Sequence, residues 1–275
     1  MKNIYQLLRI NHYIKNFIIF APILFTERYN NIDDIINVIL IFILFCLLAS
    51  AVYVFNDILD LKLDKLHPRK IQKPLANSKL SIANAYFILI ILIFISFGIS
   101  YLNPNFYVIL VLYFLINILY TIFFKKIYLL DIFVLSSNYV IRVFAGCIPL
   151  SVDLSYWMAI TVFFGALCLS AIKRKQELLK YGFKIRPVLK EYSIENLKNI
   201  ILICQILTIV FYSLYIIFLN EQYFLTIPIV TYAIFRYLKK SEDKNFSESP
   251  VEEIIKDKQN FLLIFIWLVM IILLN

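Results

Sequence analysis

Long apolar stretches recur along the whole chain, and they constrain its fold more than any other feature. Nine have the composition of membrane-spanning segments, although the first and eighth are short and fit a tilted or partly interfacial helix. They cover residues 13–25, 35–55, 82–101, 106–124, 129–150, 156–172, 197–219, 223–237 and 261–274. Backbone groups in lipid must find hydrogen-bond partners within their own segment, which favours helices. The sequence therefore predicts an all-α polytopic membrane protein with about nine transmembrane helices.

The composition agrees with this class. Hydrophobic residues make up 62% of the chain and charged residues 16%, with a mean hydropathy of +0.82, which no soluble domain of this size approaches. The net charge is +9, but the basic loops lack a nucleic-acid-binding pattern, so nucleic acid is not an expected partner. The four cysteines lie in predicted spans without close pairing, and we expect them to fill apolar space.

The distribution of basic residues predicts the orientation. If the N-terminus is cytoplasmic, all of the 27 Lys and Arg residues except Arg28 and Arg142 fall on the cytoplasmic side. The opposite topology would place them outside, against the positive-inside rule. Topology and contact with anionic lipid explain part of this excess of basic residues on one side. A more specific explanation is that the cytoplasmic side also binds an anionic substrate.

Three carboxylates stand where the second apolar stretch ends. Asp57, Asp60 and Asp64 are spaced i, i+3, i+7, so a continuous helix would place all three on one face. Acids stacked at a membrane interface repel one another, and a divalent cation relieves that repulsion. Because Mg²⁺ is usually held by one or two carboxylates together with substrate phosphates, the pattern indicates a diphosphate site. The alternative is a solvated helix end.

The fifth stretch contains an arginine. Asp131, Asn138 and Arg142 are spaced by seven and four residues and share one helical face. A lone Arg at the centre of a membrane helix costs about 2.5–3.5 kcal/mol on the insertion scale, so Arg142 is expected to face a polar cavity. The alternative is a bond to Asp131 or Asn138 that only orders the bundle.

Further charges gather at the predicted cytoplasmic ends. The sixth stretch ends in Lys173, Arg174 and Glu177, a spacing that also fits an exposed ion pair. A basic loop with prolines follows the three aspartates. The other candidates at this level are Lys15, Tyr120, Lys125, Lys126 and Arg236. Acids that hold Mg²⁺ and bases that hold phosphates together suit a substrate that carries a diphosphate. This predicts transfer at an anomeric or allylic carbon with pyrophosphate leaving.

These residues resemble a known family. The pattern Asn56-Asp57-x-x-Asp60-x-x-x-Asp64 resembles the first aspartate-rich motif of the UbiA superfamily of intramembrane prenyltransferases. Further segments are similar to its decaprenyl-phosphate phosphoribosyltransferase branch: Tyr13-Ile14-Lys15-Asn16, residues 50–57, His67-Pro68, residues 136–142, Lys173-Arg174-x-x-Glu177-Leu178 and Phe235-Arg236-Tyr237. One position departs from the superfamily. Prenyl-diphosphate users carry a second Asp-x-x-x-Asp motif where this chain has Lys173-Arg174-x-x-Glu177, which agrees with the phosphoribosyl branch.

The resemblance implies a fold and a reaction. The fold is one UbiA-like transmembrane domain over residues 1–275, with a central cavity that opens to the cytoplasm of a bacterial inner membrane. The reaction is Mg²⁺-dependent transfer of 5-phosphoribose from phosphoribosyl pyrophosphate to a polyprenyl phosphate. The implied catalytic residues are Asn56, Asp57, Asp60, Lys173 and Glu177, and the implied metal ligands are Asp57, Asp60 and Asp64. The implied substrate-binding residues are Lys15, Asp64, Tyr120, Lys126, Asp131, Arg142, Arg174 and Arg236.

Two other functions compete with this interpretation. The first is a UbiA-type prenyltransferase with a different acceptor, which the missing second acidic motif disfavours. The second is a transporter or a membrane scaffold, since intramembrane charges also mark transport paths. Transporters usually show internal repeats and helices broken by Gly or Pro, and this chain has four glycines and no visible repeat.

Overall fold

The computed structural model describes residues 2–66, 70–184, 186–243, 246 and 249–274, and every regular element in that part of the chain is helical. The predicted all-α class is therefore confirmed. His67, Pro68 and Arg69, the start of the predicted basic loop, lie outside the described residues. The α-helices are α1 (Lys2–Leu8), α2 (Ala21–Phe25), α3 (Ile32–Leu59), α4 (Leu61–Asp64), α5 (Ile82–Ser100), α6 (Pro104–Ile122), α7 (Leu130–Cys147), α8 (Tyr156–Tyr181), α9 (Ile194–Leu219), α10 (Ile227–Lys240), α11 (Pro250–Lys256) and α12 (Lys258–Leu273). The 3₁₀ segments are η1 (Ile10–Phe20), η2 (Arg28–Asn30), η3 (Lys70–Gln72), η4 (Phe124–Lys126), η5 (Ile148–Leu150), η6 (Gly182–Lys184), η7 (Pro187–Glu191) and η8 (Glu221–Thr226).

Polar caps set the beginnings of several of these helices. The side chain of Asn31 accepts hydrogen bonds from the backbone amides of the first turn of α3, and Ser81 does the same for α5. Ser193 caps α9 and Asp257 caps α12 in the same way. Each cap satisfies backbone donors that have no partner within the helix, so the polar residues between the apolar runs fix where each helix starts.

Six helices are long and apolar enough to cross a membrane, judged by length and composition over the described residues. They are α3, α5, α6 extended through η4, α7 extended through η5, α8 and α9. The other three predicted spans are shorter: residues 10–25 form η1 and α2, α10 has 14 residues, and α12 has 16. The structure supports a multi-pass membrane protein, with six rather than nine helices of full spanning length in the described part of the chain.

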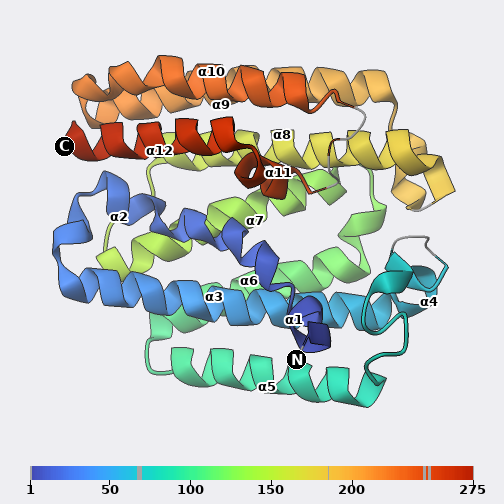
Figure 1. The fold of residues 1–275 in the computed structure, drawn as a ribbon. Coiled ribbons are helices and arrows are strands. Elements are labelled where there is room, and N and C mark those ends of the chain that lie inside the picture. The colour runs from blue at the N-terminus through green and yellow to red at the C-terminus, as the bar shows by residue number, and fades with distance from the viewer. Residues whose placement is uncertain (1, 67–69, 185, 244–245, 247–248, 275) are drawn as a thin grey trace.

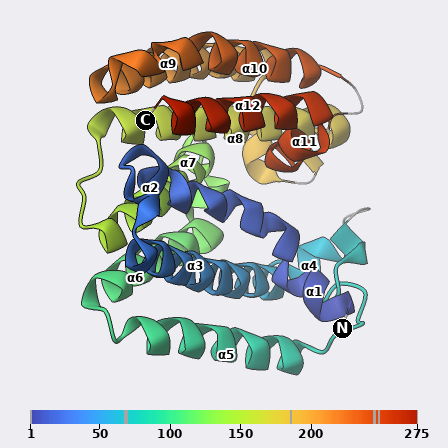
Figure 2. The ribbon, with the colours of Figure 1, turned by 60° about the vertical axis from the view of Figure 1, so that its left-hand side comes forward.

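The helices form two packed groups with η1, α2 and α7 between them (Figures 1 and 2). One group packs α3 against α5 and α6 around buried side chains such as Leu48, Leu89 and Leu110. The other packs α8, α9, α10 and α12 together. A third buried cluster, which includes Phe25 and Val143, joins α2 and α7 to α8 and α9. The C-terminal ends of α3 and α8 lie at the same end of the molecule, where α4 follows α3 (Figure 1, right). Asp57 belongs to the last turns of α3, and Lys173, Arg174 and Glu177 belong to the C-terminal part of α8.

A glycine allows η1 to lie directly against α7. A Cβ atom built on Gly146 would lie 2.0 Å from the backbone carbonyl oxygen of Ile19. Any side chain here would push η1 away from α7. Since η1 carries Lys15 and Asn16, this contact also positions part of the site described below.

We expect Gly146→Ala to destabilise the protein by about 1–3 kcal/mol, because the added methyl group overpacks a buried backbone contact. Thermal unfolding of the purified protein in detergent measures the effect. The control is Gly98→Ala on α5, where a Cβ atom would meet nothing within 4 Å. Equal unfolding temperatures for Gly146→Ala and the unaltered protein would contradict the close approach.

Candidate active site

A cavity of about 200 Å³ lies among η1, α3, α6, α7 and α8. The basic side chains that line it are Arg9, Lys15, Arg142, Lys173 and Arg186. Neutral polar side chains, among them Asn56 and Tyr120, form part of the remaining wall. Among the described side chains that line the cavity there is no carboxylate. A cleft lined by one sign of charge concentrates ligands of the opposite sign, so this cavity suits an anion.

Three of these basic side chains have donor groups that make no hydrogen bond within the described chain. Within the described chain, no hydrogen bond or salt bridge engages the ammonium group of Lys15 or Lys173. Arg186, which lies between η6 and η7, has a buried Nη1 atom without a hydrogen-bond partner in the same part of the chain. Its ionic neighbour is Asp131, at 4.0 Å. Charges that are taken out of water need a compensating partner, and here the groups converge on a cavity in which an anion would supply it.

Arg142 is held in place by neutral acceptors. Its Nε donates to Asn16 Oδ1 at 2.7 Å, its Nη1 donates to the backbone oxygen of Asn138 at 2.7 Å, and its Nη2 donates to the Tyr113 hydroxyl at 2.9 Å. The guanidinium also lies over the rings of Tyr113 and Tyr139. The suggested ion pair with Asp131 does not form, because Asp131 bonds to Arg174. Arg142 therefore keeps an uncompensated positive charge at the wall of the cavity.

Two of the three predicted metal ligands converge on one lysine. Lys73 Nζ lies 2.7 Å from Asp57 Oδ1 and 2.5 Å from Asp64 Oδ2, and the Arg9 guanidinium lies 2.5 Å from the same Asp57 oxygen. Both aspartates are almost fully buried. Lys70 of the same basic loop lies 3.8 Å from Asp64, so the described part of the loop after the aspartates contacts two of them. The partial burial of Lys70 lowers the pKa of its ammonium group.

The expectation that all three acids share one helical face is wrong at Asp60. The long helix α3 ends at Leu59, and Asp60 has φ −85° and ψ 2°, which breaks the helix before the single turn of α4. Asp60 Oδ1 instead accepts a hydrogen bond from Lys125 Nζ at 2.6 Å. Because of this turn, Asp57 and Asp64 share a cation while Asp60 bonds to Lys125 in η4, just after α6.

A buried ion-pair cluster stands behind the cavity. Arg174 is fully buried and bonds through Nε to Asp131 Oδ2 at 2.5 Å and through Nη1 to Glu177 Oε2 at 2.7 Å. Its Nη2 lies 3.4 Å from the hydroxyl of Tyr120. The Tyr192 hydroxyl donates to Asp131 Oδ1 at 2.6 Å. Burial and this hydrogen bond raise the pKa of Tyr192, so its hydroxyl stays a donor. Arg174 and Asp131 neutralise one another and join α7, α8 and the loop that carries Tyr192.

The sequence of residues 17–251 matches the UbiA prenyltransferase family. The match covers most of the chain and includes the residues of α3, α6, α7 and α8 that build the cavity. The chain belongs to the UbiA prenyltransferase family.

The relatives of this UbiA family protein include enzymes of known name. It is 28% identical over 281 residues to the decaprenyl-phosphate phosphoribosyltransferase of Corynebacterium glutamicum, covering 97% of this chain and 84% of that protein. It is 29% identical over 281 residues to the protein of the same name from Mycolicibacterium smegmatis, covering 94% of this chain and 88% of the relative. The family and these relatives identify the chain as an enzyme of the UbiA type.

Solved structures of the family share the fold. A UbiA homologue from Archaeoglobus fulgidus bound to DMAPP and Mg²⁺ superimposes with a TM-score of 0.71 at 18% identity, covering 98% of this chain and 99% of that one. The apo structure of a UbiA homologue from Aeropyrum pernix K1 gives a TM-score of 0.70 at 16% identity, with 95% and 96% covered. At these identities, the likeness concerns the fold alone.

Several predicted site residues of this UbiA family protein do not line the cavity, and they include Asp57, Asp60 and Asp64. Arg236 bonds to Asp257 and Asn260 at the start of α12, and these contacts hold the pKa of Asp257 well below its usual range. Lys126 is exposed at the end of η4. Tyr120, Asn56, Lys15, Arg142 and Lys173 line the cavity, whereas Arg174, Asp131 and Glu177 lie in the ion-pair cluster beside it.

Two of the basic residues that line the cavity were missing from the predicted site. Arg9 lies between α1 and η1 with φ 51°, and its guanidinium reaches Asp57 and the ring of Tyr53. Arg186 lies in the basic segment after α8, directly before Pro187. Arg9 could have been proposed as a site residue because it is a charged residue beside an apolar segment. Its partner Asp57 is 48 positions further along the chain, so sequence spacing does not connect the two.

Proposed function

We propose that this UbiA family protein transfers 5-phosphoribose from phosphoribosyl pyrophosphate to a polyprenyl phosphate and releases pyrophosphate. The observation that carries the proposal is the set of donor groups on Lys15, Lys173 and Arg186 that make no hydrogen bond within the described chain, around a cavity whose described lining contains no carboxylate. The reaction brings together two phosphorylated substrates and therefore needs more cations than acids. The names of the Corynebacterium and Mycolicibacterium relatives support the same reaction.

The donor is proposed to occupy the cavity with its phosphates toward the basic side chains that line it. Lys173 and Arg186 line the cavity from α8 and the segment after it, and Arg142 adds a charge from α7. Lys15 on η1 is proposed to meet the phosphate of the lipid, which enters from the membrane. Asn56 and Tyr120 line the same space and are proposed to contact the ribose. Glu177 is proposed to hold Arg174 in the ion-pair cluster beside the cavity.

The acids suit Mg²⁺ that binds together with the diphosphate. Among the described residues, no three carboxylate, His or Cys side chains form a metal cluster by themselves. Asp57 and Asp64 nevertheless already share one positive charge, the Lys73 ammonium. A pair of carboxylates completed by substrate phosphates is the usual Mg²⁺ arrangement, so these two residues fit the ion, with Asn56 adjacent. When bound, Mg²⁺ would stabilise the negative charge that develops on the leaving pyrophosphate.

The chemistry then requires little from protein side chains. An oxygen of the lipid phosphate forms a bond to C1 of the ribose while the bond between C1 and the pyrophosphate oxygen breaks, and the electron pair leaves with pyrophosphate. The attacking oxygen is already an anion, so no general base is needed. The role of the chain is to hold the two substrates in line and to offset their negative charge.

A transfer assay tests this proposal. Purified protein is incubated with ribose-labelled phosphoribosyl pyrophosphate, a polyprenyl phosphate and Mg²⁺, and we expect label to enter the lipid phase. Absence of transfer together with turnover of a polyprenyl diphosphate on another acceptor would replace the proposal with a prenyltransferase. Inactivity on both substrate pairs, in protein that unfolds cooperatively, would leave a non-catalytic role.

We expect Lys173→Met to raise the KM for phosphoribosyl pyrophosphate about tenfold or more, because a charge-assisted contact contributes about 1.5–3 kcal/mol. The KM for the lipid should change much less. Initial rates of label transfer at varied donor and varied lipid concentrations separate the two. Lys198→Met, which removes an exposed lysine from α9, is the control. An unchanged donor KM would remove Lys173 from the donor site.

A further inference from the structure

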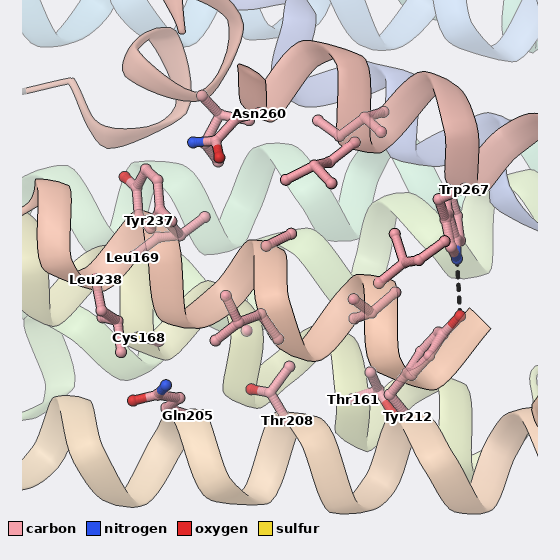
Figure 3. Close-up of a pocket in the computed structure, with 18 residues that line it drawn as sticks. Thr161, Cys168, Leu169, Gln205, Thr208, Tyr212, Tyr237, Leu238, Asn260 and Trp267 are labelled. Atoms are coloured by element: carbon pink, nitrogen blue, oxygen red, sulfur yellow. Dashed lines mark hydrogen bonds between the residues drawn. The ribbon is translucent and has the colours of Figure 1, made fainter. Parts of the chain in front are cut away.

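A second and larger cavity lies between α8, α9, α10 and α12. Its volume is about 380 Å³ and its walls are almost entirely apolar. Leu169 on α8 borders both this cavity and the candidate active site. Figure 3 shows Gln205 and Asn260 toward one end of the cavity, and a hydrogen bond between Trp267 and Tyr212 at the other end. Apolar cavities of this size with a few polar groups are typical ligand sites.

Two buried amides face this cavity with unused donors. Gln205 is 3% exposed and Asn260 is 4% exposed, and both line the cavity. Neither Gln205 Nε2 nor Asn260 Nδ2 has a hydrogen-bond partner in the part of the chain that the structure describes. The orientation of the Asn260 amide is fixed, because its Oδ1 accepts from Arg236 Nη1 at 2.6 Å. Buried donors are nearly always satisfied in native proteins, so these two point to a bound acceptor.

The wall does not supply that acceptor. The Thr208 hydroxyl donates to the backbone oxygen of Cys204 at 2.6 Å, and the Tyr237 hydroxyl donates to that of Pro250 at 2.9 Å. The Tyr212 hydroxyl accepts from Trp267 Nε1 and bonds to Thr226, both at 2.7 Å. These groups are engaged with one another or with the backbone. Within the described chain, neither amide nitrogen reaches any of these hydroxyl oxygens, so a molecule inside the cavity would supply the missing acceptor.

We propose that this cavity binds the ester region of a diacyl glycerolipid from the membrane. The ester carbonyls accept hydrogen bonds from Gln205 Nε2 and Asn260 Nδ2, and the acyl chains lie against the apolar wall. A pure hydrocarbon, such as an isoprenoid chain, would leave both donors unsatisfied. A free phosphate would have to enter an apolar cavity, which is unfavourable. A lipid ester combines an apolar body with two neutral acceptors, and α8 and α9 are of membrane-spanning length.

Native mass spectrometry of the delipidated protein tests this site with two probes. They are a diacyl phosphatidylglycerol and its dialkyl ether analogue, which share the headgroup and chain length but differ in the carbonyl groups. We expect the ester lipid to bind about tenfold more tightly, as two net hydrogen bonds would provide. Gln205→Met removes one donor at nearly constant volume. Asn260→Asp keeps the acceptor for Arg236 and replaces the donor. Each variant should reduce the preference for the ester.

Two further variants distinguish lipid binding inside the cavity from lipid binding elsewhere on the protein surface. Ala233→Phe places a large side chain in the cavity and should weaken both lipids, while Gln222→Met removes an exposed amide and should weaken neither. Thermal unfolding of each variant identifies any that fail to fold. Equal binding of the ester and ether lipids to the unaltered protein would overturn the proposal, since only water would then satisfy the amides. A second result would also overturn the proposal: a polyprenyl phosphate displaces the ester lipid, and its own affinity is unchanged by Gln205→Met. The cavity would then bind the polyprenyl chain of the lipid substrate instead.

Discussion

Asp57→Asn is expected to lower the rate of phosphoribosyl transfer about a thousandfold, while the protein still folds and inserts. Asp57 supplies one of the two carboxylates that meet at the Lys73 ammonium, where the metal and the diphosphate are proposed to bind. Losing several kcal/mol of stabilisation of the leaving group corresponds to roughly that factor. The substitution keeps the shape of the side chain and removes its charge. Label transfer at saturating donor measures the effect.

The matched control for this substitution is Asp153→Asn. Asp153 is a carboxylate that borders a different cavity, beside Cys147 and Trp157, and lies outside the site proposed here. Its loss should leave transfer unchanged. Near-normal activity of Asp57→Asn, or activity of the unaltered enzyme that persists in EDTA, would show that the acids play no part in binding a metal with the donor.

The second large effect is structural. Arg174→Met is expected to destabilise the protein by about 3–5 kcal/mol, because it leaves the carboxylate of Asp131 buried without its main partner. Unfolding by heat or denaturant in detergent measures the loss. The double variant Asp131→Asn with Arg174→Met should recover part of it, because the fully buried Asp131 position then carries no charge, although Glu177 still lacks its partner.

A surface ion pair provides the comparison. Arg28 lies 3.4 Å from Asp34 near the beginning of α3, and the Arg28 side chain is 47% exposed. Arg28→Met is expected to cost less than about 1 kcal/mol, as exposed pairs usually do. If Arg174→Met proves no more harmful than Arg28→Met, the cluster around Arg174 does not stabilise the junction of α7 and α8.

The helices were predictable where the sequence carries a continuous apolar run. Residues 82–101 and 197–219 were predicted as spans, and α5 and α9 occupy almost the same positions. Residues 13–25 were less predictable. Arg9 adopts a left-handed conformation before them, and Pro22 follows a 3₁₀ segment, so no single long helix forms. Apolar composition identifies a membrane segment, but it does not give the length of the helix.

The site was predictable only in part, because sequence spacing describes neighbours on one helix. The face shared by Asn138 and Arg142 is real, and Arg142 does contact the backbone of Asn138. Its other partners, Asn16 and Tyr113, come from η1 and α6 and could not be identified from spacing. The prediction that the three aspartates share one helical face was wrong, because the backbone turns at Asp60. No pattern of charge or hydropathy in the sequence indicates that turn.

The direct test of the central claim is a structure of the protein with phosphoribosyl pyrophosphate and Mn²⁺ in place of Mg²⁺, with the metal located by anomalous scattering. The account predicts a metal peak beside Asp57 and Asp64 and the donor's phosphates within hydrogen-bond distance of Lys173 and Arg186. Donor bound outside this cavity, or metal bound away from both aspartates, would contradict it.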